Sequence, residues 1–108
     1  MGYKSKRSKA TDISSEVKKI VYERDNGRCI YCGRAGIPNA HYISRAKGGL
    51  GIPENIVTLC LNCHENYDNG NLRREIGNYI ARYLKGIYGD SWSKGKLVFH
   101  KWNDFKKQ

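Results

Sequence analysis

The chain has 108 residues, the length of one domain, and a formal net charge of +10. It contains no apolar run long enough to cross a bilayer, and its polar N-terminus lacks the apolar centre of a secretory signal. From these properties we expect a cytoplasmic protein that neither spans a membrane nor is exported, and in the reducing cytoplasm paired cysteines favour metal over disulfides. The basic charge predicts a polyanionic partner, most commonly nucleic acid, rather than a membrane.

The basic charge lies in the two flanks of the chain. Residues 1–28 carry eight Lys/Arg against four Asp/Glu, and residues 71–108 carry nine against three. Residues 29–70 carry three of each and are neutral. We therefore expect the flanks to grip the polyanion, although a merely soluble surface is the alternative explanation.

The N-terminal flank is expected to consist of an arm and a helix. Residues 1–10 read as a basic arm that is unstructured alone and could settle along phosphates. Its basic side chains are Lys4, Lys6, Arg7 and Lys9. Helical spacing predicts a helix over residues 14–25, capped by Asp12 or Ser14 and ended by Asn26-Gly27. The apolar residues at this spacing are Ile13, Val17, Ile20 and Val21.

The middle of the chain reads as two short strands and a helix. Residues 40–44 and 54–59 can pair as strands, joined by a loop that its glycines make permissive. A helix is expected from near Leu61 to the Asp68-Asn69-Gly70 cluster.

The C-terminal flank contains the clearest amphipathic pattern, which predicts a helix over residues 71–89 packed on the core. Its apolar stripe is Leu72, Ile76, Tyr79, Ile80, Tyr83, Leu84 and Ile87. In the tail, residues 90–108, the run LVFHKW could be a strand or an extended arm, and the sequence assigns no role to Trp92, His100 or Trp102. Without repeats or a second domain, residues 1–108 are expected to form one domain.

Four cysteines occur as two Cys-x-x-Cys pairs, Cys29/Cys32 and Cys60/Cys63. Each pair places two sulfur atoms on one tight turn, and two such turns complete a tetrahedral set that suits zinc. Four thiolates leave no open position for water, so the zinc would be structural. A redox dithiol would leave the second pair unexplained, and the haem attachment pattern at Cys60–His64 lacks an export signal beside it.

The segment from Cys29 to Asp68 resembles the HNH endonucleases. The matching motifs are AHYISRAKGG, PEN at 53–55 and LCLNCH at 59–64. The resemblance implies an α+β fold with a small ββα-metal (His-Me finger) core, in which a two-stranded hairpin and a helix surround one metal ion. The cysteine-containing branch of the family has the same two cysteine pairs, so residues 29–70 would form this core with its structural zinc. The motif YDNG after the last histidine is similar to the small HNH proteins of bacteriophages.

The resemblance also implies roles for three residues. His41 would be the general base that takes a proton from water, which suits its pKa near neutrality. Asn55 would orient His41, either through the loop backbone or by bonding the imidazole directly. His64 would bind the catalytic metal. The alternatives are a strand histidine facing solvent or core, a turn or cap asparagine, and a histidine that only supports the zinc site.

The sequence departs from the family pattern at Ala40, where many members carry an Asp or His that binds the metal. Asp68 is the candidate replacement, because it lies four residues after His64 on the same helical face. Asp68 could instead start the Asp-Asn-Gly turn. Arg45 and Lys47 are the basic residues of the hairpin loop and the expected phosphate contacts nearest the chemistry, unless they are merely solvated.

These features together predict a metal-dependent endonuclease that nicks or cleaves double-stranded DNA with low sequence preference. A catalytic Mg²⁺, Mn²⁺, Ni²⁺ or Zn²⁺ would act beside the structural zinc, and the family implies 5′-phosphate and 3′-hydroxyl products. The first alternative is a catalytically inactive, zinc-stabilised DNA-binding or adaptor protein, consistent with Ala40. A structural zinc module for protein partners would leave the basic flanks unexplained. The expected setting is the cytoplasm, of a bacterial host if the protein is of phage origin.

Overall fold

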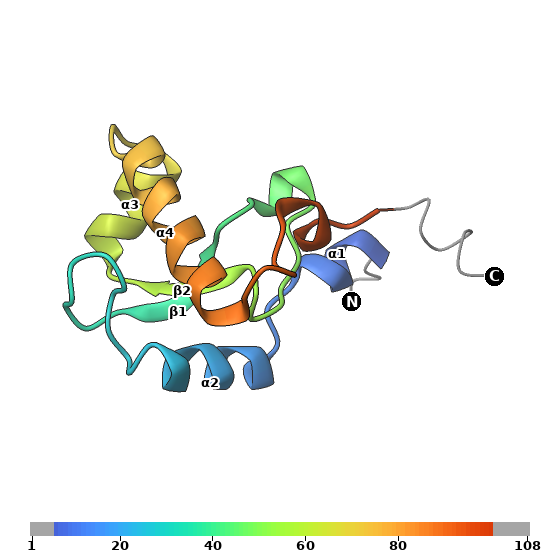
Figure 1. The fold of residues 1–108 in the computed structure, drawn as a ribbon, viewed down its shortest axis with the longest axis horizontal. Helices are drawn as coiled ribbons and strands as arrows, with labels where there is room; N and C mark the ends of the chain where they lie inside the picture. Colours follow the sequence, from blue (N-terminus) through green and yellow to red (C-terminus); the bar gives the residue numbers. More distant parts are fainter. Residues whose placement is uncertain (1–5, 101–108) are drawn as a thin grey trace, which may run out of the picture.

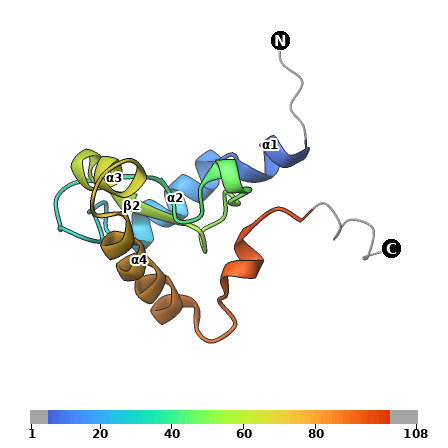
Figure 2. The ribbon, with the colours of Figure 1, turned by 90° about the horizontal axis from the view of Figure 1, so that it is seen from above.

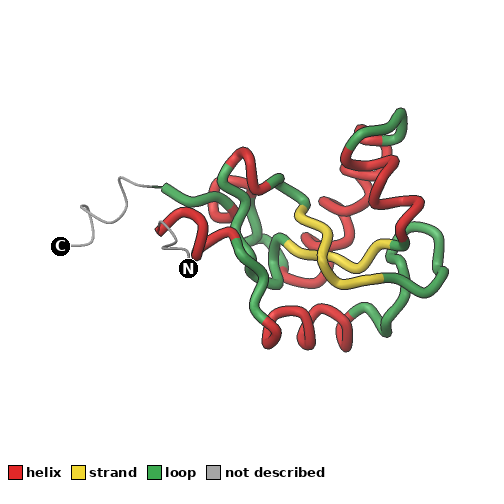
Figure 3. The backbone as a smooth tube through the Cα atoms, turned by 180° about the vertical axis from the view of Figure 1, so that it is seen from behind, coloured by secondary structure: helices red, strands yellow, loops and turns green. Residues whose placement is uncertain are grey.

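The structure is a computed structural model that describes residues 6–100. Its elements are α1 (Lys6–Thr11), α2 (Ser15–Arg24), β1 (Ile37–His41), the 3₁₀ turn η1 (Arg45–Lys47), β2 (Ile56–Leu59), α3 (Leu61–Asp68), α4 (Arg73–Tyr88) and the 3₁₀ turn η2 (Lys94–Leu97). α2 lies below the two-stranded hairpin in Figures 1 and 3 and α3 lies above it, while α4 in Figure 1 starts above the hairpin and runs down across it. The predicted α+β class, with a helix from each flank beside the hairpin, is confirmed. No helix of residues 6–100 is both long and apolar enough to span a membrane.

The hairpin is antiparallel, but its first strand begins earlier than predicted. β1 runs from Ile37 to His41 and pairs with β2 from Ile37↔Leu59 to His41↔Ile56, with an irregularity between Ile37 and Ala40. The predicted strand over residues 40–44 is wrong at both ends. Beyond His41 one more backbone bond joins the amide of Tyr42 to the carbonyl of Asn55 at 2.8 Å, and the amide of Ile43 then donates to the side chain of Asn55 in place of a strand partner.

The core lies between the hairpin and the two C-terminal helices. Ile76, Ile80 and Leu84 on α4 have no exposed surface and pack in one cluster with Val57 and Leu59 of β2. Burying side chains of this size contributes about 1.5–3 kcal/mol each. The α4 prediction is confirmed, with a narrower stripe than expected: Tyr79 and Ile87 remain 40% and 43% exposed.

α2 is held more by its ends than by an apolar face. Ser14 caps it as predicted, since its Oγ accepts a hydrogen bond of 3.1 Å from the amide of Val17. Of the four apolar residues predicted for this face, only Val21 is buried, and Ile20 is 49% exposed.

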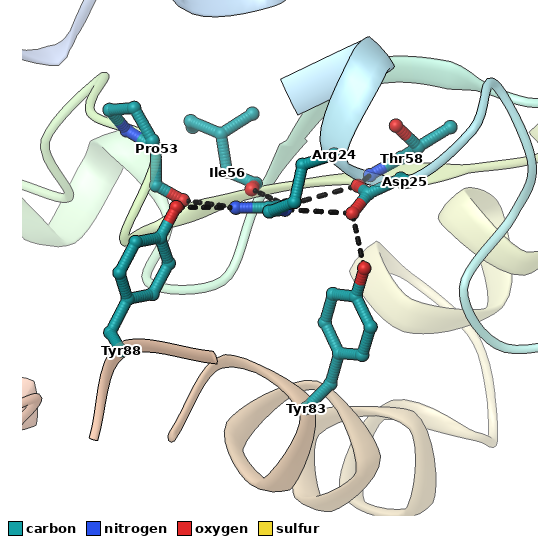
Figure 4. Close-up of polar contacts among 7 residues, drawn as sticks. All are labelled: Arg24, Asp25, Pro53, Ile56, Thr58, Tyr83 and Tyr88. Atoms are coloured by element: carbon teal, nitrogen blue, oxygen red, sulfur yellow. Dashed lines mark hydrogen bonds and ion pairs between the residues drawn. The ribbon is translucent and has the colours of Figure 1, made fainter. Parts of the chain in front are cut away.

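A buried polar network fastens the C-terminal end of α2 to β2 and α4 (Figure 4). The guanidinium of Arg24 donates to the carbonyls of Pro53 and Ile56, each at 2.8 Å, and pairs with Asp25 at 2.7 Å. Asp25, whose side chain has no exposed surface, accepts a hydrogen bond from the Tyr83 hydroxyl on α4. Burial and this bond raise the pKa of Tyr83 to about 12. The network therefore joins α2, which buries little of its expected apolar face, to the core elements β2 and α4.

Both flanks fold back onto the hairpin loop (Figures 1 and 2). On the N-terminal side, the amide of Gly51 donates to the carbonyl of Ala10 at 2.9 Å. On the C-terminal side, the amide of Leu50 donates to Leu97 at 2.7 Å, and Val98 forms a single bridge with Gly49. The N-terminal flank is therefore not an unstructured arm over residues 6–10, because helix formation and loop contacts order it; Lys4 lies outside the described residues.

The tail forms neither a regular strand nor a free arm up to residue 100. It makes the turn η2 and the single bridge, and Trp92 Nε1 donates to the carbonyl of Glu54 at 2.9 Å. His100 contacts the carbonyl of Gly95 at 2.8 Å. Both side chains thus have structural partners, while Trp102 lies outside the described residues.

Candidate active site and metal centre

The four cysteines form one cluster in the described part of the chain. Their sulfur atoms all lie within 4.8 Å of one another, and the sulfurs of Cys32 and Cys60 are 3.6 Å apart. Cys29, Cys60 and Cys63 are buried, and all four cysteines are free of disulfides. Four thiolates at these separations could hold a tetrahedral structural metal such as zinc. The predicted grouping is confirmed.

Each cysteine pair lies on a turn in which a backbone amide donates a hydrogen bond to a cysteine sulfur. The amides of Cys32 and Cys63 lie 3.4 Å from the sulfurs of Cys29 and Cys60, respectively. Gly33 after the first pair has a φ of 84°, a left-handed conformation that glycine adopts without strain. Amide donors favour the thiolate, the ionised form that binds metal.

The pKa values of the cysteines also indicate that the cluster would bind a cation. Burial and hydrogen bonds with neighbouring sulfurs raise the pKa of Cys63. Burial opposes ionisation of Cys29 as well, but backbone hydrogen bonds outweigh it and lower its pKa to about 7. Thiols this close impede one another's ionisation, and a bound metal would relieve that conflict by neutralising the thiolates.

A second site lies in a surface pocket of about 440 Å³. His41 at the end of β1 lines this pocket together with His64 and Asp68 of α3. Cys63 is buried beside its cluster while the adjacent His64 reaches the pocket, because neighbouring helical residues differ in direction by about 100°. The two imidazoles expected to face one cation therefore line one cavity.

The environment of His41 fixes its tautomer. Its Nε2 lies 2.8 Å from the carbonyl oxygen of Thr11, the last residue of α1. A carbonyl can only accept, so Nε2 carries the proton and Nδ1 keeps its lone pair. Burial lowers the pKa of His41 below its ordinary 6.5, and the charge of Arg45 acts in the same direction against the opposing bond to Thr11. The imidazole is accordingly neutral at pH 7 and able to accept a proton.

Asn55 binds the loop backbone, the first of the two arrangements considered for it. Its Oδ1 accepts from the amide of Ile43 at 2.9 Å, and its Nδ2 donates to the carbonyls of Ile43 and Leu50 at 3.2 and 2.9 Å. The residue has no exposed surface. Gly49 completes the loop, since a Cβ there would lie 1.6 Å from the carbonyl oxygen of Ile43. Asn55 therefore fixes where the chain turns after His41.

Replacing Asn55 with alanine is expected to lower the free energy of unfolding by about 2 kcal/mol, because three partly buried backbone groups lose their partners. Chemical denaturation monitored by circular dichroism measures the change. Asn62→Ala, at an exposed position on α3, is the matched control and should stay within about 0.5 kcal/mol of the unaltered chain. Equal stability of the two variants would contradict the bracing role.

His64 and Asp68 contact each other across one turn of α3. His64 Nε2 and Asp68 Oδ2 are 3.1 Å apart. Two ligands at right angles on an ion with bonds of about 2.1 Å are separated by about 3.0 Å. The pair thus fits a shared cation, and without one it forms a His–Asp hydrogen bond.

The predicted phosphate contacts of the hairpin loop have different surroundings. Arg45 lines the pocket of His41 and forms an ion pair with Asp12. Lys47 lies outside that pocket and lines a neighbouring one. Arg45 is therefore partly neutralised where it lies.

In the N-terminal flank, Lys6, Arg7 and Lys9 are exposed. Arg7 donates to the carbonyl of Ala46 at 2.7 Å, so its guanidinium braces the hairpin loop. The contacts of this flank with nucleic acid stay a prediction.

Three further residues at the site were not found from the sequence. Thr11 acts through its backbone carbonyl, which no residue pattern reveals. Asn39 lines the pocket two residues before His41 on β1, and its buried Oδ1 has no hydrogen-bond partner among the described residues. The period of two along a strand could have placed it on the face of His41. Arg73, at the start of α4, lines the pocket from a helix that was interpreted only as core.

The fold and the two sites define a small ββα-metal architecture: a hairpin, the following helix and a four-cysteine cluster beside a histidine pocket. A family model described as HNH endonuclease matches residues 29–70, which include β1, β2, nearly all of the pocket and all four cysteines. The resemblance to the HNH endonucleases that the sequence predicted is confirmed for this segment, which the model of that family matches. No curated protein matches the chain.

Proposed function

We propose that this protein is a metal-dependent DNA endonuclease that hydrolyses phosphodiester bonds with low sequence preference. HNH domains generally act on nucleic acid, and the strongest support in this chain is the single pocket shared by His41, His64 and Asp68. The formal charge of +10 suits a DNA substrate, most simply a duplex. We further propose one domain over residues 1–108, acting in the reducing cytoplasm, in a setting like that of the small phage proteins it resembles.

In this proposal His41 is the general base. With Nε2 engaged by Thr11, its Nδ1 can take a proton from a water attacking the phosphorus atom. Asn55 holds the loop that follows and so keeps the imidazole in position. Arg45 and Lys47 contact phosphates nearby, with Lys6, Arg7, Lys9 and the undescribed Lys4 further along the substrate.

His64 and Asp68 would hold the catalytic cation, Mg²⁺, Mn²⁺, Ni²⁺ or Zn²⁺. Their 3.1 Å separation and their nitrogen and oxygen donors fit such an ion. When bound, the cation would supply neutralisation of the charge that develops on the phosphate and on the leaving 3′ oxygen. The products would be 5′-phosphate and 3′-hydroxyl ends, one strand being cut per encounter.

The four cysteines would hold a structural zinc that is separate from this chemistry. Three of them are buried, and all four donors of a tetrahedral ion would be sulfur, so no position remains for substrate.

One observation favours an alternative, a catalytically inactive zinc-stabilised DNA-binding or adaptor protein. Ala40 occupies the position where many HNH proteins have a metal ligand, and it is fully buried in the core. Its methyl group cannot coordinate a cation, so the site would rely on His64 and Asp68.

Nicking of supercoiled plasmid separates the two functions. We expect the unaltered chain to nick DNA only when Mg²⁺, Mn²⁺ or Ni²⁺ is added, and His64→Ala to abolish nicking at all of these ions. Asp68→Ala should likewise lose nicking, or require a much higher concentration of the ion to nick. An unaltered chain that binds DNA without cutting it, under every metal, would establish the alternative instead. Nicking at the same rate by both variants would mean that the pocket is not the active site.

A further inference from the structure

A second pocket, of about 550 Å³, adjoins the proposed active site. Ser44 and Arg73 line both pockets, so the two are continuous. The second pocket lies between the hairpin loop, the start of α4 and the turn η2. Its lining residues therefore come both from the segment that resembles the HNH family and from the C-terminal flank.

The pocket is positively charged. Its lining includes Lys47, Arg73, Arg74 and Lys94, and among the described residues that line it none is Asp or Glu. Arg74 and Lys94 come from beyond the segment that matches the HNH family model. A concave surface with several cations and no carboxylate attracts a polyanion more strongly than the same charges on a convex surface.

Two of the cations lie at the end of a helix where positive charge is unfavourable. Arg73 and Arg74 occupy the first turn of α4, a helix of 16 residues, where the helix dipole already adds positive charge. The N-cap residue, Leu72, makes no side-chain capping bond. Two arginines here repel the helix end, and an anion in the pocket would relieve that repulsion.

Aromatic rings hold two of the cations over the pocket. The guanidinium of Arg73 lies 5.6 Å from the centre of the Tyr67 ring, and the ammonium of Lys94 lies 5.9 Å from that of Tyr42. Both tyrosines line the pocket. Such contacts position a cation without neutralising it, so both charges stay available to a ligand.

We propose that this second pocket is a cradle for the phosphate backbone of the DNA strand next to the scissile bond. The proposal rests on the proposed function, because the adjoining pocket supplies the scissile position. Arg73 at the boundary contacts the phosphate nearest the cut, and Lys47, Arg74 and Lys94 contact the backbone beyond it. The C-terminal flank, rather than the N-terminal one, thereby supplies most of the grip beside the active site.

The test compares two double variants of equal charge. Arg74→Gln with Lys94→Gln removes two cations of the cradle. Within the described residues neither side chain makes a hydrogen bond, and Lys94 makes only its contact with the Tyr42 ring. Lys19→Gln with Lys85→Gln removes two exposed cations from α2 and from the last turn of α4. The measurements are fluorescence anisotropy of a labelled DNA duplex over a range of salt concentrations with Ca²⁺ as the ion, and plasmid nicking with Mg²⁺ or Mn²⁺.

The cradle variant is expected to bind DNA roughly tenfold or more weakly and to reduce the slope of log K against log salt by about two, one for each lost phosphate contact. Its KM for nicking should rise with kcat nearly unchanged. The control variant should change affinity less than about threefold. Thermal melting must show both variants folded; if the cradle variant melts early, Arg74→Lys with Lys94→Arg, which keeps the charges, should restore binding.

Equal weakening by the two variants would overturn the proposal, because only net charge would then matter. Binding by the cradle variant as tight as that of the unaltered chain would also overturn it, while leaving the nuclease proposal intact. Conversely, the chain could bind DNA tightly through the cradle and never nick it. That result would overturn the nuclease proposal and support the cradle.

Discussion

Replacing His41 with glutamine is expected to lower the single-turnover rate of plasmid nicking by about 10²–10⁴-fold, the usual contribution of a general base. Glutamine keeps a polar group that can reach the carbonyl of Thr11, but its amide cannot take a proton from water. DNA affinity and melting temperature should change little. Quenched-flow measurement of nicking at saturating enzyme gives the rate of the chemical step.

His100→Gln is the matched control, since this histidine is exposed and contacts only the carbonyl of Gly95 among the described residues. Its rate should stay within about twofold of the unaltered chain. A similar loss in both variants, or no loss in His41→Gln, would remove His41 from the mechanism.

The pH dependence of the same step follows from the environment of His41. Burial lowers the pKa of this imidazole below 6.5, so the neutral, active form is present at and above pH 6.5 and is lost as the pH falls through the lowered value. The rate should therefore rise with pH and level off, with its midpoint below 6.5. The folded state also binds fewer protons at His41 than the unfolded state does near this pH, so His41→Gln should weaken the decline in stability below pH 6.5.

Local patterns in the sequence were sufficient for the elements that depend on neighbouring residues. The apolar period of α4 predicted the burial of Ile76, Ile80 and Leu84, and the spacing of Cys60 and Cys63 placed both on the turn that starts α3. In each case the side chains that determine the structure are a few positions apart. The four-cysteine cluster could be predicted for the same reason, because it consists of two such turns.

Contacts through backbone atoms or buried ion pairs could not be predicted in this way. The partner of His41 is a carbonyl of Thr11, and the loop ends are held by amides and carbonyls from both flanks. These groups are the same in every residue, so the sequence does not distinguish them. Likewise, no residue pattern predicted that Arg24 and Asp25 hold α2 in place, where an apolar face was expected. The early end of β1 has a related cause, since the amide of Ile43 donates to the side chain of Asn55 and not to a strand partner.

The positions of these contacts show a structural role for the two flanks beside the proposed active site. The segment that matches the HNH family model contains His41, but the carbonyl that fixes its tautomer lies in α1 and the ion-pair partner of Arg45 follows it. Gly51 shows how closely the two parts fit, because a Cβ there would lie 1.9 Å from the carbonyl oxygen of Asp12. The flanks therefore help to build the proposed active site and do not merely add charge.

Removing the proposed zinc is expected to unfold the chain. Structural zinc contributes about 10–16 kcal/mol in small zinc-binding peptides, which is comparable to the whole stability of about 5–15 kcal/mol of a typical domain. The cluster joins the turn before β1 to the start of α3, and three of its cysteines are buried in or beside the core. Elemental analysis should find one zinc per chain, and a strong chelator should abolish the cooperative thermal transition seen by circular dichroism.

Cys60→Ser with Cys63→Ser should reproduce the effect of the chelator, whereas His64→Ala should keep the zinc and the thermal transition while losing nicking. This contrast tests whether the two metals are separate, because Cys63 and His64 are adjacent in the sequence and differ in the site that they line. Returning Zn²⁺ to the chelated chain should restore the fold, and Mg²⁺ alone should restore neither fold nor nicking. A metal-free chain that melts cooperatively at an unchanged temperature would show that the sulfur cluster is not a structural metal site.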